Sequence, residues 1–86
     1  MMEQSRGLLE FVAKEGPLSL YSLARSLKKG SETEEESFER ITDQTYWLLA
    51  VGLLEKKLTE TEDGTEVMVS ATRAGRDIIK IEKAIR

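Results

Sequence analysis

The 86-residue sequence predicts a mostly α-helical single domain, covering residues 1–86, that carries one β-hairpin in its second half. Three observations lead to this prediction. Apolar residues recur at helical spacing in three segments that precede residue 52. The pair Asp63-Gly64 follows, and this pair is a strong signal for a two-residue hairpin turn, in which both residues need positive φ. A final segment from Thr72 onward again has helical periodicity.

The first helix is expected from about Ser5 to Glu15, with Ser5 as the N-cap. Gly16 and Pro17 end this helix, because glycine suits the left-handed position after a helix and proline cannot continue one. Its apolar face is formed by Leu8, Leu9, Phe11 and Val12.

Leu18 is expected in a very short strand before the second helix, which covers residues 20–28 and ends at Gly30. Ser19 is the expected N-cap of this helix. Its apolar residues fall at i, i+3, i+4 and i+7, which places them on one face. They are Leu20, Leu23, Ala24 and Leu27.

The third helix is the longest, and it is expected over residues 34–51. Two capping boxes fit its start, either Thr33 with Glu36 or Ser31 with Glu34. Acidic residues in the first turn complement the helix dipole. The inward stripe is expected to contain Phe38, Ile41, Thr45, Leu48 and Leu49.

The hairpin is expected over residues 54–70 and the last helix over residues 72–86, with Thr72 as the N-cap. Apolar residues of this helix recur at four, three and four residues, which is a heptad-like seam typical of helix pairing. The seam comprises Ala74, Ile78, Ile81 and Ile85. It predicts a homodimer whose interface contains Ile78, Ile81 and Ile85. The expected core of the domain comprises Leu8, Val12, Leu20, Leu23, Leu27, Ile41, Leu48, Leu53 and Val69.

This order of elements resembles a winged helix, the helix-turn-helix module with a β-hairpin wing. The resemblance rests on Gly-Pro-Leu-Ser at residues 16–19, on Gly-Leu-Leu-Glu at residues 52–55 and on Thr-x-x-Gly at residues 72–75. It covers nearly the whole chain. The order of elements is similar to that of the small winged-helix regulators of bacteria and archaea. Many of those proteins are transcriptional repressors that dimerise through terminal helices. The resemblance therefore implies duplex DNA as a partner and transcription regulation as the function.

The resemblance places DNA contacts on the exposed face of the third helix, on the turn before it and on the wing. Arg40 and Gln44 have suitable chemistry in the third helix, because arginine pairs with guanine and glutamine with adenine in the major groove. Four further cations could neutralise phosphates. The candidate DNA-binding residues are Lys28, Lys29, Arg40, Gln44, Arg73 and Arg76.

The distribution of charge favours a second interpretation. Residues 32–66 carry eleven acidic and three basic residues, a net charge of −8, although the whole chain has a net charge of −3. Acidic residues at the start of the third helix and at the wing tip oppose binding to phosphates. The alternative function is therefore a protein–protein interaction module in a transcription or replication assembly, where the acidic helix meets a basic partner. Tyr46 and Trp47 could anchor such a partner, or Trp47 could pack under the wing or against the first helix.

The composition excludes several classes of function. The chain contains no cysteine and no histidine, which excludes disulfides, thiolate or histidine metal sites and the common nucleophilic triads. We expect no enzyme activity, no cofactor and no metal. The sequence contains no long uncharged apolar run, so we expect no membrane partner and a cytoplasmic location. Small, charge-rich domains without cysteine are common in thermophiles, and an archaeal or thermophilic source is consistent with this composition.

Overall fold

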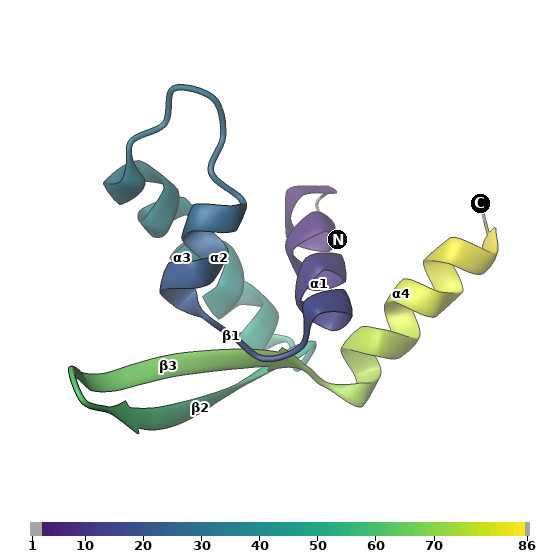
Figure 1. Cartoon of the computed structure of the whole chain (residues 1–86). Coiled ribbons are helices and arrows are strands. Elements are labelled where there is room, and N and C mark those ends of the chain that lie inside the picture. Colours follow the sequence, from purple (N-terminus) through teal and green to yellow (C-terminus); the bar gives the residue numbers. More distant parts are fainter. Residues whose placement is uncertain (1–2, 86) are drawn as a thin grey trace.

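The computed structural model describes residues 3–85, and the side chains of residues 5–85, as a winged helix (Figure 1). Four helices and three strands follow one another in the predicted order. They are α1 (Glu3–Glu15), β1 (Leu18–Ser19), α2 (Leu20–Ser26), α3 (Glu34–Ala50), β2 (Leu54–Thr61), β3 (Gly64–Ala71) and α4 (Arg73–Ile85). The predicted fold class is confirmed, and the observed element ends lie within two residues of the predicted ones.

The three strands form one antiparallel sheet in the order β1-β3-β2. Leu18 pairs with Val69, so the short strand before α2 ties the wing to the helices. The hairpin occurs where it was predicted, but Thr61 pairs with Gly64 and the two turn residues are therefore Glu62 and Asp63. No residue other than glycine has positive φ in the described chain, whereas Gly64 has a φ of 126°. The predicted type I′ turn at Asp63-Gly64 is therefore wrong, because the glycine lies just after the turn.

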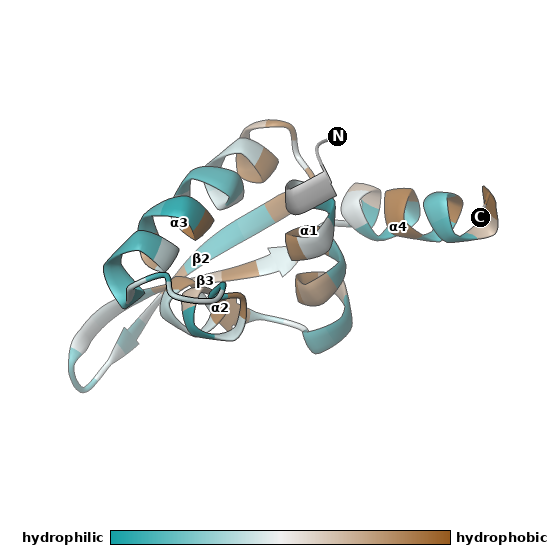
Figure 2. Cartoon of the chain, turned by 90° about the horizontal axis from the view of Figure 1, so that it is seen from above, coloured by the Kyte–Doolittle hydropathy of each residue, from teal (hydrophilic) through white to brown (hydrophobic). Residues whose placement is uncertain are grey.

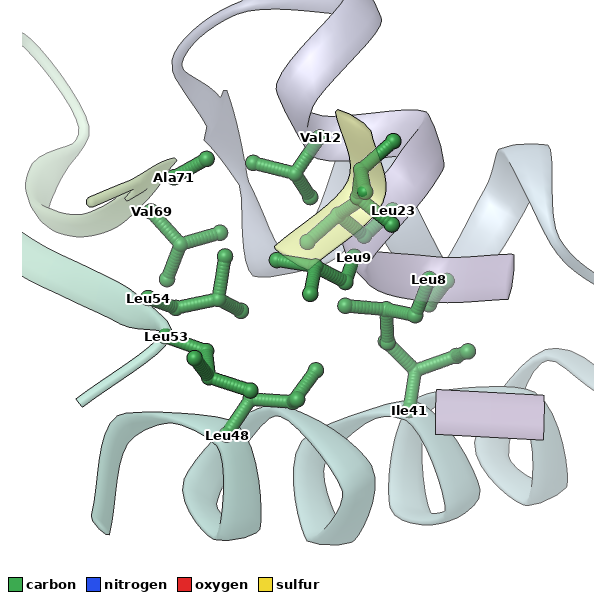
Figure 3. Close-up of a cluster of buried hydrophobic side chains, with 12 residues drawn as sticks. Leu8, Leu9, Val12, Leu23, Ile41, Leu48, Leu53, Leu54, Val69 and Ala71 are labelled. Carbon is green, nitrogen blue, oxygen red and sulfur yellow. The ribbon is translucent and has the colours of Figure 1, made fainter. Parts of the chain in front are cut away.

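The hydrophobic core lies between the helices and the inner end of the sheet (Figure 3). It draws on all four helices, on β2 and β3, and on the segment that joins α3 to β2. Its buried members are Leu8, Leu9, Val12, Leu23, Ala24, Ile41, Leu48, Leu53, Leu54, Val69, Ala71 and Ile79. The predicted core is confirmed except for Leu27, which is only partly buried against it.

Three of the predicted N-caps are present. The Ser19 hydroxyl accepts a hydrogen bond from the amide of Ser22 at 3.0 Å. Thr33 and Glu36 form the capping box of α3, with hydrogen bonds of 3.1 and 2.9 Å. The Thr72 hydroxyl accepts from the amide of Gly75 at 3.1 Å. Of the two capping boxes that the sequence allowed, the structure contains the one at Thr33.

The predicted cap at Ser5 is wrong. Helix α1 already begins at Glu3, so Ser5 lies inside the first turns of the helix rather than before them. Its side chain is buried, and its hydroxyl has no hydrogen-bond partner among the described residues. Serine was predicted at the helix start because serine is common at N-caps, but here it is a small residue that fits a buried position.

Helix α4 leaves the body of the domain on the side away from the wing (Figures 1 and 2). Its first turn lies against the carbonyl group of Leu53, an approach that leaves no room for a side chain at Gly75. Ile79 enters the core, and ion pairs join the helix to α1, Arg6 to Glu82 at 3.7 Å and Lys83 to Glu10 at 3.4 Å. The direction of α4 is thus set by the packing of Gly75 and Ile79 and by the ion pairs of Glu82 and Lys83 with α1.

Candidate nucleic-acid interface

The helix-turn-helix segment is held together by one buried hydrogen bond. The hydroxyl of Ser37 in α3 donates to the carbonyl oxygen of Ala24 in α2 at 2.6 Å. Both residues are buried, and a hydrogen bond within a low dielectric environment is stronger than one in water. The bond fixes the two helices relative to each other at the point where a winged helix would meet DNA.

The turn between α2 and α3 is closed by Arg40 and Glu32. The Arg40 guanidinium donates from Nε to Glu32 Oε2 at 2.8 Å and from Nη2 to Glu32 Oε1 at 3.0 Å. Nη2 also donates to the carbonyl oxygen of Leu27 at 2.7 Å, and the amide of Lys29 donates to Glu32 Oε1 at 3.0 Å. The hydrogen bond from Arg40, helped by that amide, lowers the pKa of Glu32 to about 2, and the same pair raises the pKa of Arg40.

This arrangement corrects the expectation that Arg40 lies on a solvated face of α3. Its side chain is mostly buried, and its guanidinium donates to groups of the turn. Among the described residues of α3, Arg40 is the only cation. Among its described residues, α3 therefore presents no cation that is not already bonded within the chain.

Gln44 also departs from the expectation of an exposed position. It is 9 % exposed and faces α1, in a small cavity that it shares with Gly7, Leu8 and Ile41. The resemblance to a winged helix placed it on the exposed face, but it lies one helical turn from Ile41 and Leu48 on the inward side. Its amide cannot reach a base without a movement of α3.

The outer surface of α3 is acidic. Glu35, Glu39 and Asp43 are exposed along the helix. The wing tip is acidic as well, and its charged residues are all exposed: Glu60, Glu62, Asp63 and Glu66. The two elements that a winged helix most often presents to DNA are thus both negatively charged here.

The predicted phosphate-binding cations fall into two separate groups. Lys28 and Lys29 are exposed in the turn after α2, whereas Arg73 and Arg76 are exposed in the first turn of α4. Figure 1 shows these two segments at opposite ends of the domain. Arg76 Nη1 donates to the carbonyl oxygen of Ala71 at 2.7 Å, which holds that side chain against the end of β3. The four residues do not form one continuous basic stripe within a single chain.

Three aromatic side chains of α3 are exposed. Trp47 is 45 % exposed and Tyr46 is 48 % exposed, and the Lys56 ammonium of β2 lies 5.7 Å from the centroid of the Tyr46 ring. Phe38, which was predicted in the inward stripe, is exposed and faces Tyr21 of α2, with 6.0 Å between the ring centroids. The sequence did not predict this pair. Its one indication was that Tyr21 lies outside the apolar face of α2, where an aromatic ring is expected to be exposed.

The seam of α4 is only partly covered by its own chain. Ile78 is partly buried, whereas Ile81 is 58 % exposed and Ile85 is 80 % exposed. The contact with the core is made instead by Gly75 and Ile79, on a neighbouring face of the helix. The contact between α4 and α1 therefore leaves Ile81 and Ile85 of the seam exposed. Figure 2 shows hydrophobic segments along the part of α4 that stands away from the domain.

The fold is that of several solved regulators. FabT of Streptococcus pneumoniae, solved in complex with DNA, is 15 % identical over 99 % of this chain, with a TM-score of 0.75. PadR of Bacillus subtilis, solved in complex with operator DNA, is 18 % identical over 100 % of this chain, with a TM-score of 0.76. A PadR-family transcriptional regulator from Eggerthella lenta is 18 % identical over 95 % of this chain and 74 % of its own, with a TM-score of 0.70.

The chain spans only about half of the first two proteins, 54 % of FabT and 49 % of PadR. Comparison of the sequence with protein-family models and with curated proteins finds no match. None of the described helices is long and apolar enough to cross a membrane. The likeness to these structures establishes the winged-helix fold, which the sequence had predicted from its order of elements.

Proposed function

We propose that this chain is a transcriptional regulator that binds duplex DNA as a homodimer and has no catalytic activity. The observation that carries the proposal is the agreement of fold, over essentially the whole chain, with two regulators that were solved on DNA. In a symmetric dimer the recognition helices of two copies reach successive major grooves about one helical turn apart.

In this proposal the phosphate contacts come from two groups of exposed cations, one before α3 and one at the start of α4. Lys28 and Lys29 are exposed beside its N-terminal end, and Arg73 and Arg76 supply charge at the start of α4. Arg40 and Gln44 act as positioning residues, because one closes the turn and the other lies against α1. Affinity then depends on few phosphate contacts, and we expect each of them to contribute about 0.9 to the slope of log affinity against log salt concentration.

The test begins with selection of bound sequences from a pool of random duplexes, followed by titration of the selected duplex at about 50 and about 200 mM salt. Each lost phosphate contact lowers the salt slope by about 0.9. The double variant Lys28→Ala with Lys29→Ala should therefore lower the slope by about two units. A matched control, Lys14→Ala with Lys80→Ala, removes the same charge elsewhere on the surface. Absence of any selected duplex, or equal slopes for both double variants, would contradict the proposal.

The dimer is proposed to form through the exposed part of the α4 seam. Burying Ile81 and Ile85 removes two large apolar side chains from water, each worth about 1.5–3 kcal/mol when fully buried. The double variant Ile81→Asp with Ile85→Asp should be monomeric in sedimentation velocity, while Leu58→Asp on the exposed wing should leave the association unchanged. A monomeric wild-type chain at high micromolar concentration would refute the dimer.

A second function, the docking of a basic protein, is favoured by one observation. The outer surface of α3 carries Glu35, Glu39 and Asp43 and no exposed cation among the described residues. Opposite charge on a partner would steer its approach and orient the complex. Binding of a basic protein or peptide to this chain is measured in the absence of DNA. Binding under that condition supports the second function independently of the first.

A further inference from the structure

A groove runs between α2 and the N-terminal half of α3. Its volume is about 360 Å³, and its walls come from both helices of the helix-turn-helix segment. The floor is apolar and contains Ala24 together with the rings of Tyr21 and Phe38. Tyr21 is 59 % exposed and Phe38 is 38 % exposed, so neither ring is used to fill the core. The two rings meet at 49° with their centroids 6.0 Å apart, and form a joint apolar surface.

The groove is rigid before any partner binds. The Ser37 hydroxyl is bonded to the carbonyl oxygen of Ala24 in its floor, and this bond fixes the distance between the two walls. The caps at Ser19 and Thr33 fix the first turns of both helices. The ion pair of Arg40 with Glu32 closes the turn beyond the end of the groove. A preformed site loses less conformational entropy on binding than a flexible one does.

The two walls carry opposite charge. On α2 and the turn that follows are Arg25 and Lys28, and the Arg25 guanidinium lies 5.9 Å from the centroid of the Tyr21 ring. On α3 are Glu34 and Glu35, both exposed, and Glu35 continues into the acidic surface formed with Glu39 and Asp43. An apolar group in the groove would thus have carboxylates on one side, which attract a cation and repel a phosphate.

We propose that this groove is a docking site for a segment of a partner protein that presents an apolar side chain next to lysine or arginine. The apolar side chain packs on Tyr21, Ala24 and Phe38, and the cation lies against Glu34 and Glu35. Aromatic residues in preformed pockets are frequent anchors of protein interfaces. The inference deepens the second of the two functions proposed above and rests on it, because it names the site and the chemistry of that basic partner.

A single-stranded nucleic acid is the competing occupant. Exposed rings beside Arg25 and Lys28 could stack bases, as aromatic residues do in single-strand-binding proteins. The carboxylates of the opposite wall argue against it, because a backbone that follows the groove would bring its phosphates toward Glu34 and Glu35. The experiment therefore includes a nucleic-acid probe.

The probe is a short synthetic peptide that contains leucine next to lysine. Three further probes are the same peptide with glutamate in place of lysine, the same peptide with serine in place of leucine, and oligo(dT). Each is titrated into the ¹⁵N-labelled chain in the absence of duplex DNA, and amide shifts are followed. We expect only the leucine–lysine peptide to saturate, with shifts centred on Tyr21, Ala24 and Phe38.

Two double variants test the groove: Tyr21→Ser with Phe38→Ser, and Glu34→Gln with Glu35→Gln. Each should lower the affinity for the leucine–lysine peptide by about tenfold, the loss typical of an interface anchor. The control Leu58→Ser changes an exposed apolar residue of the wing and should alter the affinity by less than about twofold, as surface contacts outside an interface do. All four substituted groove residues are exposed, so we expect the variants to fold. Their amide spectra check this.

Three outcomes would overturn the inference. Equal binding of the serine-containing peptide, with shifts spread over Glu39 and Asp43, would mean that a basic partner binds the acidic surface without the groove. Saturation by oligo(dT) at the two rings would assign the groove to nucleic acid. No binding of any peptide at millimolar concentration would remove both the groove and the second proposed function, while leaving the DNA titration unaffected.

Discussion

The close approach of α4 to the rest of the domain predicts opposite effects for one substitution at two glycines. Both Gly7 and Gly75 lie inside helices, where replacing glycine by alanine usually adds about 1 kcal/mol of stability. A Cβ at Gly7 would have no atom within 4 Å, so Gly7→Ala should give this full gain. A Cβ at Gly75 would overlap the carbonyl oxygen of Leu53 and lie 3.1 Å from Cδ1 of Leu9.

The overlap at Gly75 is costly because the neighbouring atom belongs to the backbone. The Leu53 carbonyl also accepts a hydrogen bond from the amide of Thr72 at 3.1 Å, so it cannot move aside without weakening that bond. Overfilling a packed site costs about 1–3 kcal/mol, and the strained hydrogen bond adds about 1 kcal/mol. After the gain in helix propensity of about 1 kcal/mol, we expect Gly75→Ala to lower the free energy of unfolding by about 2 kcal/mol.

The assay is thermal and urea unfolding followed by circular dichroism, with all proteins at one concentration, because self-association makes apparent stability depend on concentration. In a domain of this size 1 kcal/mol corresponds to about 4–8 °C in Tm. Gly7→Ala should therefore raise Tm by about 4–8 °C, and Gly75→Ala should lower it by about 8–16 °C. If Gly75→Ala is stabilised as much as Gly7→Ala, then α4 does not lie against Leu53, and the direction assigned to the helix is wrong.

Three other predictions follow from the structure. Thr33→Ala removes one half of the capping box and should cost about 1 kcal/mol in urea unfolding, whereas Ser31→Ala, two residues earlier, should cost much less. The lowered pKa of Glu32 means that its contribution to stability is present above about 4.5 and is lost as the pH falls toward about 2. The stability difference between wild type and Glu32→Gln should therefore shrink over that range, and a constant difference would contradict the pairing with Arg40. Hydrogen exchange should be fastest near the turn at residues 62–63 of the wing and slowest at Val69, because only the inner end of the hairpin packs on the core.

Local signals in the sequence were enough to predict the order of the elements. Capping residues such as Ser19 and Thr72 act within three residues of their partners, so they can be recognised without the fold. The hairpin was found for the same reason, although the glycine was placed one residue too early in the turn. Apolar spacing identified the core because Leu23, Ile41 and Leu48 must face one interior whatever the loops do.

The candidate site was harder to predict, because its character depends on contacts between distant residues. Arg40 was expected to be available for DNA. The seven-residue connection from α2 to α3 instead places Glu32 beside it, with Arg40 Nε 2.8 Å from Glu32 Oε2. Phe38 and Gln44 lie near the two borders of the inward face of α3, where helical periodicity alone cannot decide exposure. The groove at Tyr21 requires the relative position of α2 and α3, which is set by the buried bond from Ser37 to the carbonyl oxygen of Ala24.

The sheet order has a consequence for how copies of this chain behave in concentrated solution. Within residues 3–85, β2 pairs with β3 alone, so its outer edge has backbone groups without a partner there, and all but its first residue are exposed. An open edge of this length could pair with the same edge of another molecule and start fibre growth. Lys56 and Lys57 lie on this strand, and lysine on an edge strand opposes such pairing through repulsion and the cost of removing its charge from water. These two charges thus oppose growth of the sheet beyond β2 while the wing extends from the domain.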